Sequence, residues 1–495
     1  MFERQFYLVH ENLSVNHLPN FKVISLNNWS LAIQEKNYYS TVKNNHLEVH
    51  IIGCFVHPDY KDIAPNKFAE IVLGGCENID EINNALYKSC GRFLIIVIIE
   101  EKIVIRSDAV SLAQIHFDKI NKVICTDIRL YEHLTNDRSV NLDANRFYLN
   151  TMPYRANGDG WIGEDTIYEN LQKLLPNQAL YLPDFSVSRY WPSSHKHDTN
   201  LANSLTEIAD NLKNTLQAFQ NLAPLSVAVT SGNDSRLALA VSLSLDKSCY
   251  YFIDQLPEMK SDDVDIVIGQ QLCDIAGVEY HVHHIGSEDA VPLDFKNVYF
   301  KNTFFAKKER LAVSHYYSEH LKSYINICGV GEFGRSVYGN GIIPPSENYL
   351  CHKYHYTNSK FANAMAKRWL DKYKIEIGDF GYNPYSLFYI EQRLGNWGAV
   401  GNSESDIALE EVNPYASHYN IEKFLSLPRE ETTYINNRVF YALTAHFNDL
   451  FSALPVNPVY KLKKKIAKFV KATPLFPFVE YLIFAYKSKV IGRFD

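Results

Sequence analysis

The chain has 495 residues, of which 46% are hydrophobic and 21% are charged. These values exclude disorder as the main state, and the length favours two or three domains. The formal net charge of −7 argues against a protein whose whole surface binds nucleic acid. No apolar run reaches the roughly 18 to 20 residues of a membrane-spanning helix.

The cysteines and the N-terminal sequence point to the cytoplasm. The eight cysteines include no C-x-x-C pair, and most lie in apolar runs. Reduced, buried thiols are therefore expected. The first twenty residues lack a cationic segment followed by an apolar core, so a secretory signal is not expected.

Residues 1–150 are predicted to be mostly strand. Short β-branched runs lie at 47–59, 91–100 and 102–108, and the last two predict a tight hairpin. A further strand and a short helix are predicted over 122–134. Glycines and prolines punctuate residues 151–195, which predicts a connector.

The pattern changes after residue 200, where helices and strands alternate. The predicted helices are 201–222, 235–245 and 262–278, and the predicted strands are 224–230, 248–254, 279–285 and 324–331. Residues 355–450 are predicted to be mainly helical. Strands that alternate with helices are typical of a parallel sheet with crossover helices. We therefore predict an α/β protein with a β-rich domain over 1–195, an α/β domain over 200–455 and a tail over 456–495.

One loop carries the pattern of an anion site. A predicted strand ends at Thr230 and a helix starts near Asp234, and every residue of the turn is small or polar: Thr230, Ser231, Gly232, Asn233, Asp234 and Ser235. Small side chains let backbone N–H groups approach an anion, and the helix N-terminus adds positive potential. Asp234 suits Mg²⁺, which bridges carboxylates and phosphates. The alternative is an ordinary capped helix.

This loop resembles the PP-loop of ATP pyrophosphatases, S-G-G-x-D-S, with Thr230 and Ser231 at its first two positions. The following Arg236 resembles the D-S-R branch of asparagine-synthetase-like proteins. Residues 91–117 resemble that family's amidotransferase-like N-domain, and residues 327–339 resemble its second ATP-site loop. The resemblance implies an Ntn-type α+β sandwich followed by a PP-loop domain with a helical C-terminal part.

The resemblance also implies roles for individual residues. The residues expected to bind ATP and pyrophosphate are Thr230, Ser231, Gly232, Asn233, Asp234, Ser235, Phe252, Gly329 and Gly331. Asp234 and Glu332 are the expected Mg²⁺ ligands, and Arg335 is the expected catalytic residue, steadying a phosphate or the substrate carboxylate. The structural alternatives are a core side chain for Phe252, a helix cap for Glu332 and a surface ion pair for Arg335. A late Lys of the family has no counterpart here, because residues 432–443 offer only Arg438.

A glutaminase of this kind uses an N-terminal Cys as its nucleophile. Here residue 2 is Phe2, and the first cysteine, Cys54, lies inside an apolar run, so glutaminase activity is not expected. The resemblance then implies an AMP-forming amide ligase that adenylates the carboxylate of a small molecule, glycan or peptide. The nitrogen comes from an amine or ammonia, or from a partner protein, in surface-polysaccharide or peptide tailoring. The alternative is a degenerate family member that binds nucleotide or serves as a scaffold without chemistry.

The C-terminal tail has a lysine cluster followed by an aromatic and aliphatic run, over 461–489. Such a segment suits the surface of an anionic membrane or a membrane-bound partner. The alternative is a C-terminal helix whose lysines are solvated.

Overall fold

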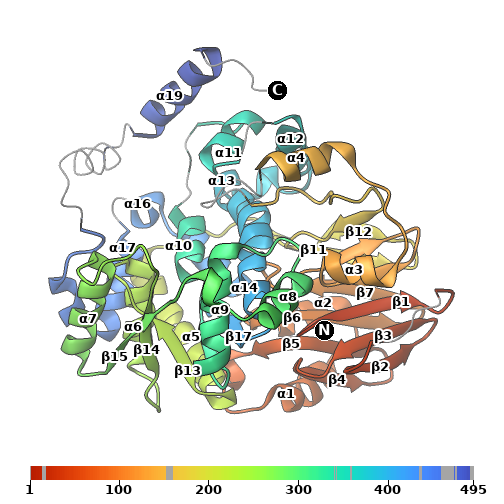
Figure 1. The fold of residues 1–495 in the computed structure, drawn as a ribbon, viewed down its shortest axis with the longest axis horizontal. Coiled ribbons are helices and arrows are strands. Elements are labelled where there is room, and N and C mark those ends of the chain that lie inside the picture. Colours follow the sequence, from red (N-terminus) through yellow and green to blue (C-terminus); the bar gives the residue numbers. More distant parts are fainter. Residues whose placement is uncertain are drawn as a thin grey trace.

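The computed structural model describes residues 2–13, 18–151, 160–338, 341, 343–356, 359–433, 437–458, 473 and 476–490. Within this part of the chain the strands form three sheets, two antiparallel and one parallel. Figure 1 shows the antiparallel sheets on one side of the molecule and the parallel sheet on the other, with helices between and above them.

The two antiparallel sheets have six strands each, in the orders β10-β8-β9-β1-β3-β2 and β12-β11-β7-β6-β5-β4. Their strands are β1 (Phe6–His10), β2 (Phe21–Leu26), β3 (Trp29–Gln34), β4 (Tyr39–Lys43), β5 (Glu48–Val56), β6 (Cys90–Ile99), β7 (Lys102–Ser107), β8 (His116–Asp118), β9 (Val123–Cys125), β10 (Leu171–Lys173), β11 (Gln178–Leu182) and β12 (Ser186–Arg189). Leu8 and Leu31 of one sheet share a buried cluster with Ile96 and Ile105 of the other, so the sheets pack face to face as a sandwich. The predicted hairpin is confirmed by the pairing of Ile99 with Lys102.

One prediction for this region is wrong, and some of its strands were not predicted individually. Strands β1 to β4 lie in the part predicted to be mostly strand but had no predicted ranges, since several positions of β2 are exposed and its apolar pattern is weak. Residues 151–195 do more than connect, because β10 completes one sheet and β11 and β12 complete the other. The glycines and prolines there mark the turns between short strands.

The third sheet is parallel, with the order β15-β14-β13-β16-β17. Its strands are β13 (Leu225–Ala228), β14 (Tyr250–Gln255), β15 (Tyr280–His284), β16 (Ile325–Ile327) and β17 (Glu410–Val412). The chain adds β14 and β15 on one side of β13 and then returns to add β16 and β17 on the other. The strand order therefore reverses between β13 and β16. The mixed α/β fold class predicted from the sequence is confirmed, whereas its domain boundaries stay predictions.

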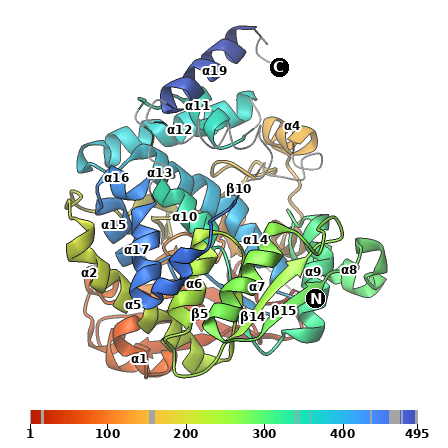
Figure 2. The same cartoon turned by 90° about the vertical axis from the view of Figure 1, so that its left-hand side faces the viewer.

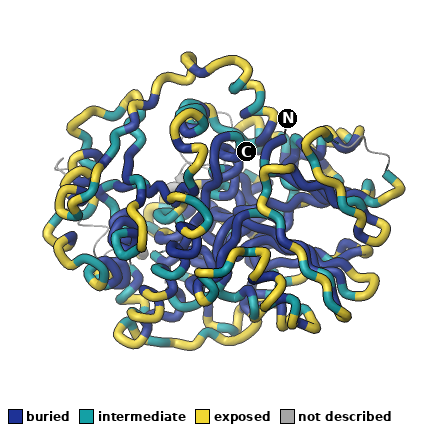
Figure 3. The backbone as a smooth tube through the Cα atoms, turned by 90° about the horizontal axis from the view of Figure 1, so that it is seen from below, coloured by how far each residue is buried: buried dark blue, intermediate teal, exposed yellow. Residues whose placement is uncertain are grey.

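The helices surround these sheets. They are α1 (Pro65–Ile71), α2 (Ile79–Ala85), α3 (Ile128–Leu134), α4 (Leu142–Thr151), α5 (Leu201–Leu222), α6 (Asn233–Ser242), α7 (Val264–Ala276), α8 (Leu293–Asn302), α9 (Lys308–His320), α10 (Val330–Tyr338), α11 (Glu347–Lys353), α12 (Lys360–Glu376), α13 (Pro384–Phe388), the π-helical segment η5 (Tyr389–Gly398), α14 (Ala399–Ser405), α15 (His418–Ser426), α16 (Arg429–Thr432), α17 (Arg438–Phe447) and α19 (Phe476–Val490). Figure 3 shows the buried backbone gathered in the middle of the molecule and the exposed backbone at its rim. Among the described helices, none is both long and apolar enough to cross a membrane.

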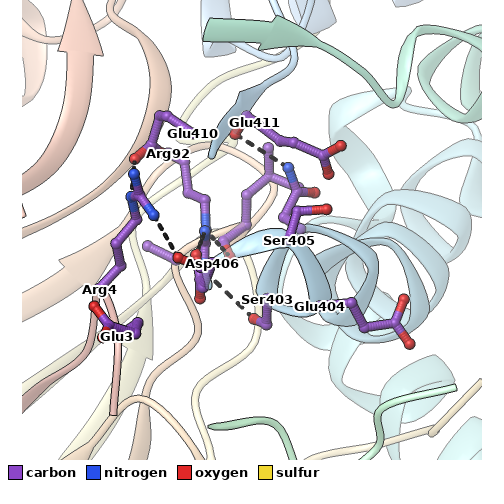
Figure 4. Close-up of polar contacts among 12 residues, drawn as sticks. Glu3, Arg4, Arg92, Ser403, Glu404, Ser405, Asp406, Glu410 and Glu411 are labelled. Atoms are coloured by element: carbon purple, nitrogen blue, oxygen red, sulfur yellow. Dashed lines mark hydrogen bonds and ion pairs between the residues drawn. The ribbon is translucent and has the colours of Figure 1, made fainter. Parts of the chain in front are cut away.

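A buried ionic cluster joins the sandwich to the parallel sheet (Figure 4). The Arg92 guanidinium, on β6, forms a two-pronged ion pair with Asp406, with one nitrogen–oxygen distance of 2.9 Å. Arg4 Nε lies 3.2 Å from a carboxylate oxygen of Glu410 on β17. Arg92, Asp406 and Glu410 are buried, and the side chain of Arg4 is only 15% exposed. Each charge of this ionic cluster therefore depends on its partner.

We expect Arg92→Met to lower the free energy of unfolding by about 3 to 5 kcal/mol, because it leaves the buried Asp406 carboxylate without its main counter-charge. Thermal unfolding of the whole chain measures this. The control is Lys67→Ala, which removes an ion pair to Glu70 whose side chains are 60% and 51% exposed, and which should cost at most about 1 kcal/mol. Equal effects of the two variants on the free energy of unfolding would contradict the stabilising role proposed for this ionic cluster.

Candidate functional site

The loop predicted to bind an anion lies at the carboxyl end of β13, where the strand order of the parallel sheet reverses. Helix α6 begins at Asn233, directly after Gly232, and no side chain caps its N-terminus. The hydroxyls of Thr230 and Ser235 lie 2.8 Å apart, and Ser235 Oγ also accepts the Thr230 N–H. The loop thus closes on itself and leaves the first turn of α6 open.

Two further contacts anchor the loop from behind. Ser231 points away from the open side, since its hydroxyl and its N–H both donate to Asp265 of α7, at 2.5 and 3.0 Å. The guanidinium of Arg236, which is fully buried, donates to the carbonyls of Phe451, Leu454 and Pro455. Ser231 and Arg236 therefore hold the loop in place and do not face a ligand.

The second predicted loop follows β16 and faces the first. Gly329 has a φ of +66°, which favours glycine, and its carbonyl accepts a hydrogen bond from Asn413 at 2.9 Å. A Cβ on Gly334 would lie 2.0 Å from Asp234 Oδ1, so only glycine lets α10 approach this carboxylate so closely. The two loops meet through these small residues.

A cavity of about 360 Å³ opens between the two loops, within the usual range of small-ligand pockets. Of the predicted site residues, seven line it: Thr230, Gly232, Asp234, Ser235, Gly329, Gly331 and Glu332. Asn233 is half-buried in the first turn of α6. Phe252, Arg335 and Ser231 are not on the cavity wall.

Asp234 is the most distinctive group in the cavity. Its Oδ1 accepts a hydrogen bond from Tyr338 at 3.0 Å. No Lys, Arg or His in the described part of the chain lies within 4.0 Å of its carboxylate. Burial raises the pKa of Asp234 to about 7. Arg335 acts against this rise without forming an ion pair with Asp234. A half-buried carboxylate that faces a cavity and has no ion pair fits a bound cation.

Glu332 and Arg335 form an ion pair with each other. Arg335, whose side chain is 64% exposed, forms an ion pair with Glu332, and Tyr389 donates to the other Glu332 oxygen. Glu332 therefore borders the cavity with both oxygens engaged. To bind metal it would have to exchange one of these partners.

Phe252 lies behind the site. Its ring is fully buried and stacks against His283, with 4.6 Å between ring centres, and it meets Tyr317 edge-on at 6.0 Å. Tyr317 itself lines the cavity, whereas Phe252 does not. Phe252 is therefore a core side chain next to a residue of the wall.

Three charged residues of the wall were not predicted from the sequence: Asp254, Arg310 and Glu411. Asp254 accepts from Tyr317 at 2.5 Å and lies 3.0 Å from His283 Nδ1. Arg310 of α9 lies 3.5 Å from a Glu411 oxygen that also accepts from Asn326. None belongs to a local motif, and only the position of Asp254 at the end of a predicted strand gave a signal.

The wall therefore carries four carboxylates and, within the described residues, the single cation Arg310. Such a wall repels a bare anion and favours one accompanied by a divalent cation. No group of three or more His, Cys, Asp or Glu residues in the described part of the chain is arranged as a metal site. The donor set fits Mg²⁺ in another way, because this ion often uses one or two carboxylates together with substrate phosphates.

The cysteines are not placed for nucleophilic chemistry. Cys54 is fully buried in β5, and burial raises its pKa well above the ordinary value. Cys328 borders the cavity, but burial raises its pKa in the same way. Because the thiolate is the nucleophile, neither thiol is activated.

No protein-family model matches the sequence, and no curated protein matches it either. Two solved structures are similar in part. Glutamine phosphoribosylpyrophosphate (PRPP) amidotransferase from B. subtilis, complexed with ADP and GMP, is 9% identical over 57% of this chain and 60% of its own, with a TM-score of 0.23. A structure described as the allosteric regulatory enzyme of purine biosynthesis is 8% identical over 59% of this chain and 61% of its own, with a TM-score of 0.24. The chain spans about three fifths of each of these proteins, and function has to be argued from its own residues.

We expect Asp234→Asn to stabilise the ligand-free protein above pH 7. The pKa of Asp234 in the fold is about 7, above the ordinary value near 4, so the folded state loses stability as pH rises through this window. Asparagine does not ionise, so the variant does not lose stability in this way. The gain at pH 8 should be on the order of 1 to 3 kcal/mol and should shrink toward pH 4.

Unfolding midpoints measured across this pH range test the expectation. Asp262→Asn, on an exposed carboxylate near the start of α7, is the matched control and should change nothing. An Asp234→Asn variant less stable than the wild type at pH 8 would show that the carboxylate serves the fold.

Proposed function

We propose that the chain is an ATP-dependent amide ligase that activates a substrate carboxylate as an acyl-adenylate and releases pyrophosphate. The observation that carries this proposal is the position of the cavity. It lies outside the carboxyl ends of β13 and β16, where the strand order reverses, and this is where open α/β sheets bind their ligands.

The chemistry of the two loops supports a nucleotide as that ligand. The open first turn of α6 and the hydroxyls of Thr230 and Ser235 suit phosphate oxygens. Asp234 would hold Mg²⁺, which stabilises charge on departing pyrophosphate. The protein's own part is to fix the two loops against each other, through Gly334 and through the anchors of Ser231 and Arg236.

The acyl substrate would be a small-molecule, glycan or peptide carboxylate, and the nitrogen donor an amine or ammonia. Arg310 is the cation of the described wall and is therefore the first candidate to meet the substrate carboxylate or a phosphate. Arg335 would need to leave Glu332 to take this role.

A second candidate is a nucleotide-binding member without catalysis. It is favoured by the wall itself, where the described residues include no Lys and where Arg310 is held by Glu411. This protein would bind ATP with Mg²⁺ and release neither AMP nor pyrophosphate.

We expect AMP and pyrophosphate to form from ATP and Mg²⁺ when the correct acid is supplied. A panel of uronic acids, amino acids and peptides is the search set. Asp234→Ala should lower the rate by about 100-fold or more, while Asp262→Ala should leave it unchanged. AMP release that persists in Asp234→Ala would contradict adenylation at this cavity.

Calorimetry with ATP separates the two candidates when no acid gives AMP. Binding that needs Mg²⁺ and is lost in Asp234→Ala would support the non-catalytic candidate. Absence of ATP binding at millimolar concentration would overturn both.

A further inference from the structure

A second and larger cavity, of about 510 Å³, lies away from the nucleotide site. Strands β6 and β7 supply one wall through Phe93, Ile95 and Arg106. Helix α2 and the segment 190–194 supply the next, and the C-terminal helical region closes it with Tyr382 and His418. The proposed ligase chemistry uses none of these residues.

Arg106 is the unusual group in this cavity. Its side chain is only 4% exposed, and its guanidinium lies 4.8 Å from the ring centre of Tyr190. It donates a hydrogen bond to Asn83. No carboxylate of the described residues lies within 4.0 Å of it, whereas Arg92 and Arg189, on the same sheet, both have one.

Other polar groups in the cavity do not neutralise Arg106. Asp108 is occupied by its own loop, because its oxygens accept the N–H groups of Val110, Leu112 and Ala113. Arg106 Nε and Ser89 Oγ are both buried without a hydrogen-bond partner. A buried guanidinium without a counter-charge is costly, and a ligand carboxylate would remove that cost.

We propose that this cavity binds a small organic monocarboxylate, with Arg106 as its counter-ion. The guanidinium matches a carboxylate in two parallel hydrogen bonds. Asp80 and Glu422 also border the cavity, which disfavours multiply charged phosphates and favours a ligand whose other groups are hydroxyls or an amine. The aromatic side chains of Trp191 and Tyr382 provide flat apolar surface for its carbon skeleton.

The experiment is titration calorimetry of the whole chain, without nucleotide, with D-glucuronate, L-serine and other hydroxylated or amino monocarboxylates. Glucose is the neutral probe and should not bind. At least one carboxylate should bind saturably, and Arg106→Met should weaken it at least tenfold. Comparing the uronic acids with the amino acids shows whether the ligand is a sugar acid or an amino acid.

A second variant separates ligand binding from folding. Ser194 is exposed at the edge of the cavity, so Ser194→Trp should obstruct it and weaken binding without unfolding the protein. Arg106→Met should keep or raise the unfolding temperature, because it removes an unpaired buried charge. Failure of all the acids to bind at millimolar concentration, or unchanged binding in either variant, would overturn the proposal. Because no ATP is present, this result does not depend on the ligase reaction.

Helix α19 carries an independent inference. Its residues Phe478, Leu482 and Tyr486, spaced by four, are 51%, 65% and 68% exposed, and Ile483 beside them is 46% exposed. The other side of the helix docks on α11, where Phe484 lies 5.4 Å from Tyr349 between ring centres. Figures 1 and 2 both show α19 projecting from the body beyond α11. The four exposed side chains, called here the apolar stripe, are therefore not covered by any residue in the described part of the chain.

The charges around α19 indicate what covers the stripe. Residues 459–495 contain nine Lys and Arg and only two acidic residues, whereas the whole chain has 49 and 56. The lysine cluster over 461–471 lies outside the described residues, so its part in the argument is its sequence alone. We infer that the apolar stripe inserts into the surface of an anionic bilayer, to which the lysines are attracted.

Co-sedimentation with phosphatidylcholine vesicles, with and without phosphatidylserine, tests this. Binding should require phosphatidylserine, weaken with salt and fall at least tenfold in Leu482→Glu/Tyr486→Glu. The matched control is Leu142→Glu/Leu149→Glu, at positions 72% and 53% exposed on α4, and it should bind as the wild type does. Equal binding of the two variants, no binding at all, or a dimer that only the α19 variant dissociates would overturn the inference.

Discussion

Two adjacent glutamates on the short strand β17 connect the two halves of this protein. Successive side chains of a strand point to opposite sides. Glu410 accordingly meets Arg4 of the sandwich (Figure 4). Glu411 meets Arg310 and Asn326 at the cavity. Burial raises the pKa of both carboxyl groups, and Arg4 and Arg310 act against that rise. Their charges are tolerable only while these partners stay in place.

This constraint fixes the cavity relative to the sandwich. Arg310 lines the cavity and lies on α9, and Ser405 of α14 contacts the same guanidinium at 3.5 Å. The next residue, Asp406, is the partner of Arg92 in the sandwich. A shift of the sandwich against the parallel sheet would therefore disturb the one cation of the described wall. The two-sheet sandwich therefore supports the wall of the cavity through these ion pairs.

The sequence predicted what is local and missed what is long-range. Helix α5 was predicted over 201–222 and has these bounds, because Asn200 caps it and its apolar residues keep one spacing throughout. The two glycine-containing loops were found because their residue types carry the signal. Glu411, Arg310 and Asp254 come from β17, α9 and β14, and only the sheet order brings them together. The three residues of β17 were too few to show a strand pattern, and so its two glutamates had no context. Residues 461–471, the lysine cluster of the tail, lie outside the described part of the chain, so that interpretation stays a prediction.

The two cavities differ in the sign of their unpaired charge, which is negative in one and positive in the other. This difference suits them to different ligands. The cavity at the switch of strand order has an excess of carboxylates on its wall, which suits the proposed binding of an anion together with a metal ion. The cavity beside β7 has a buried guanidinium without a counter-charge, which suits the proposed binding of a carboxylate alone. Both features lower the stability of the empty protein, since unpaired buried charge is costly. A chain that served only as a scaffold would be more stable without both charges, so the presence of each in its own cavity supports a role in ligand binding.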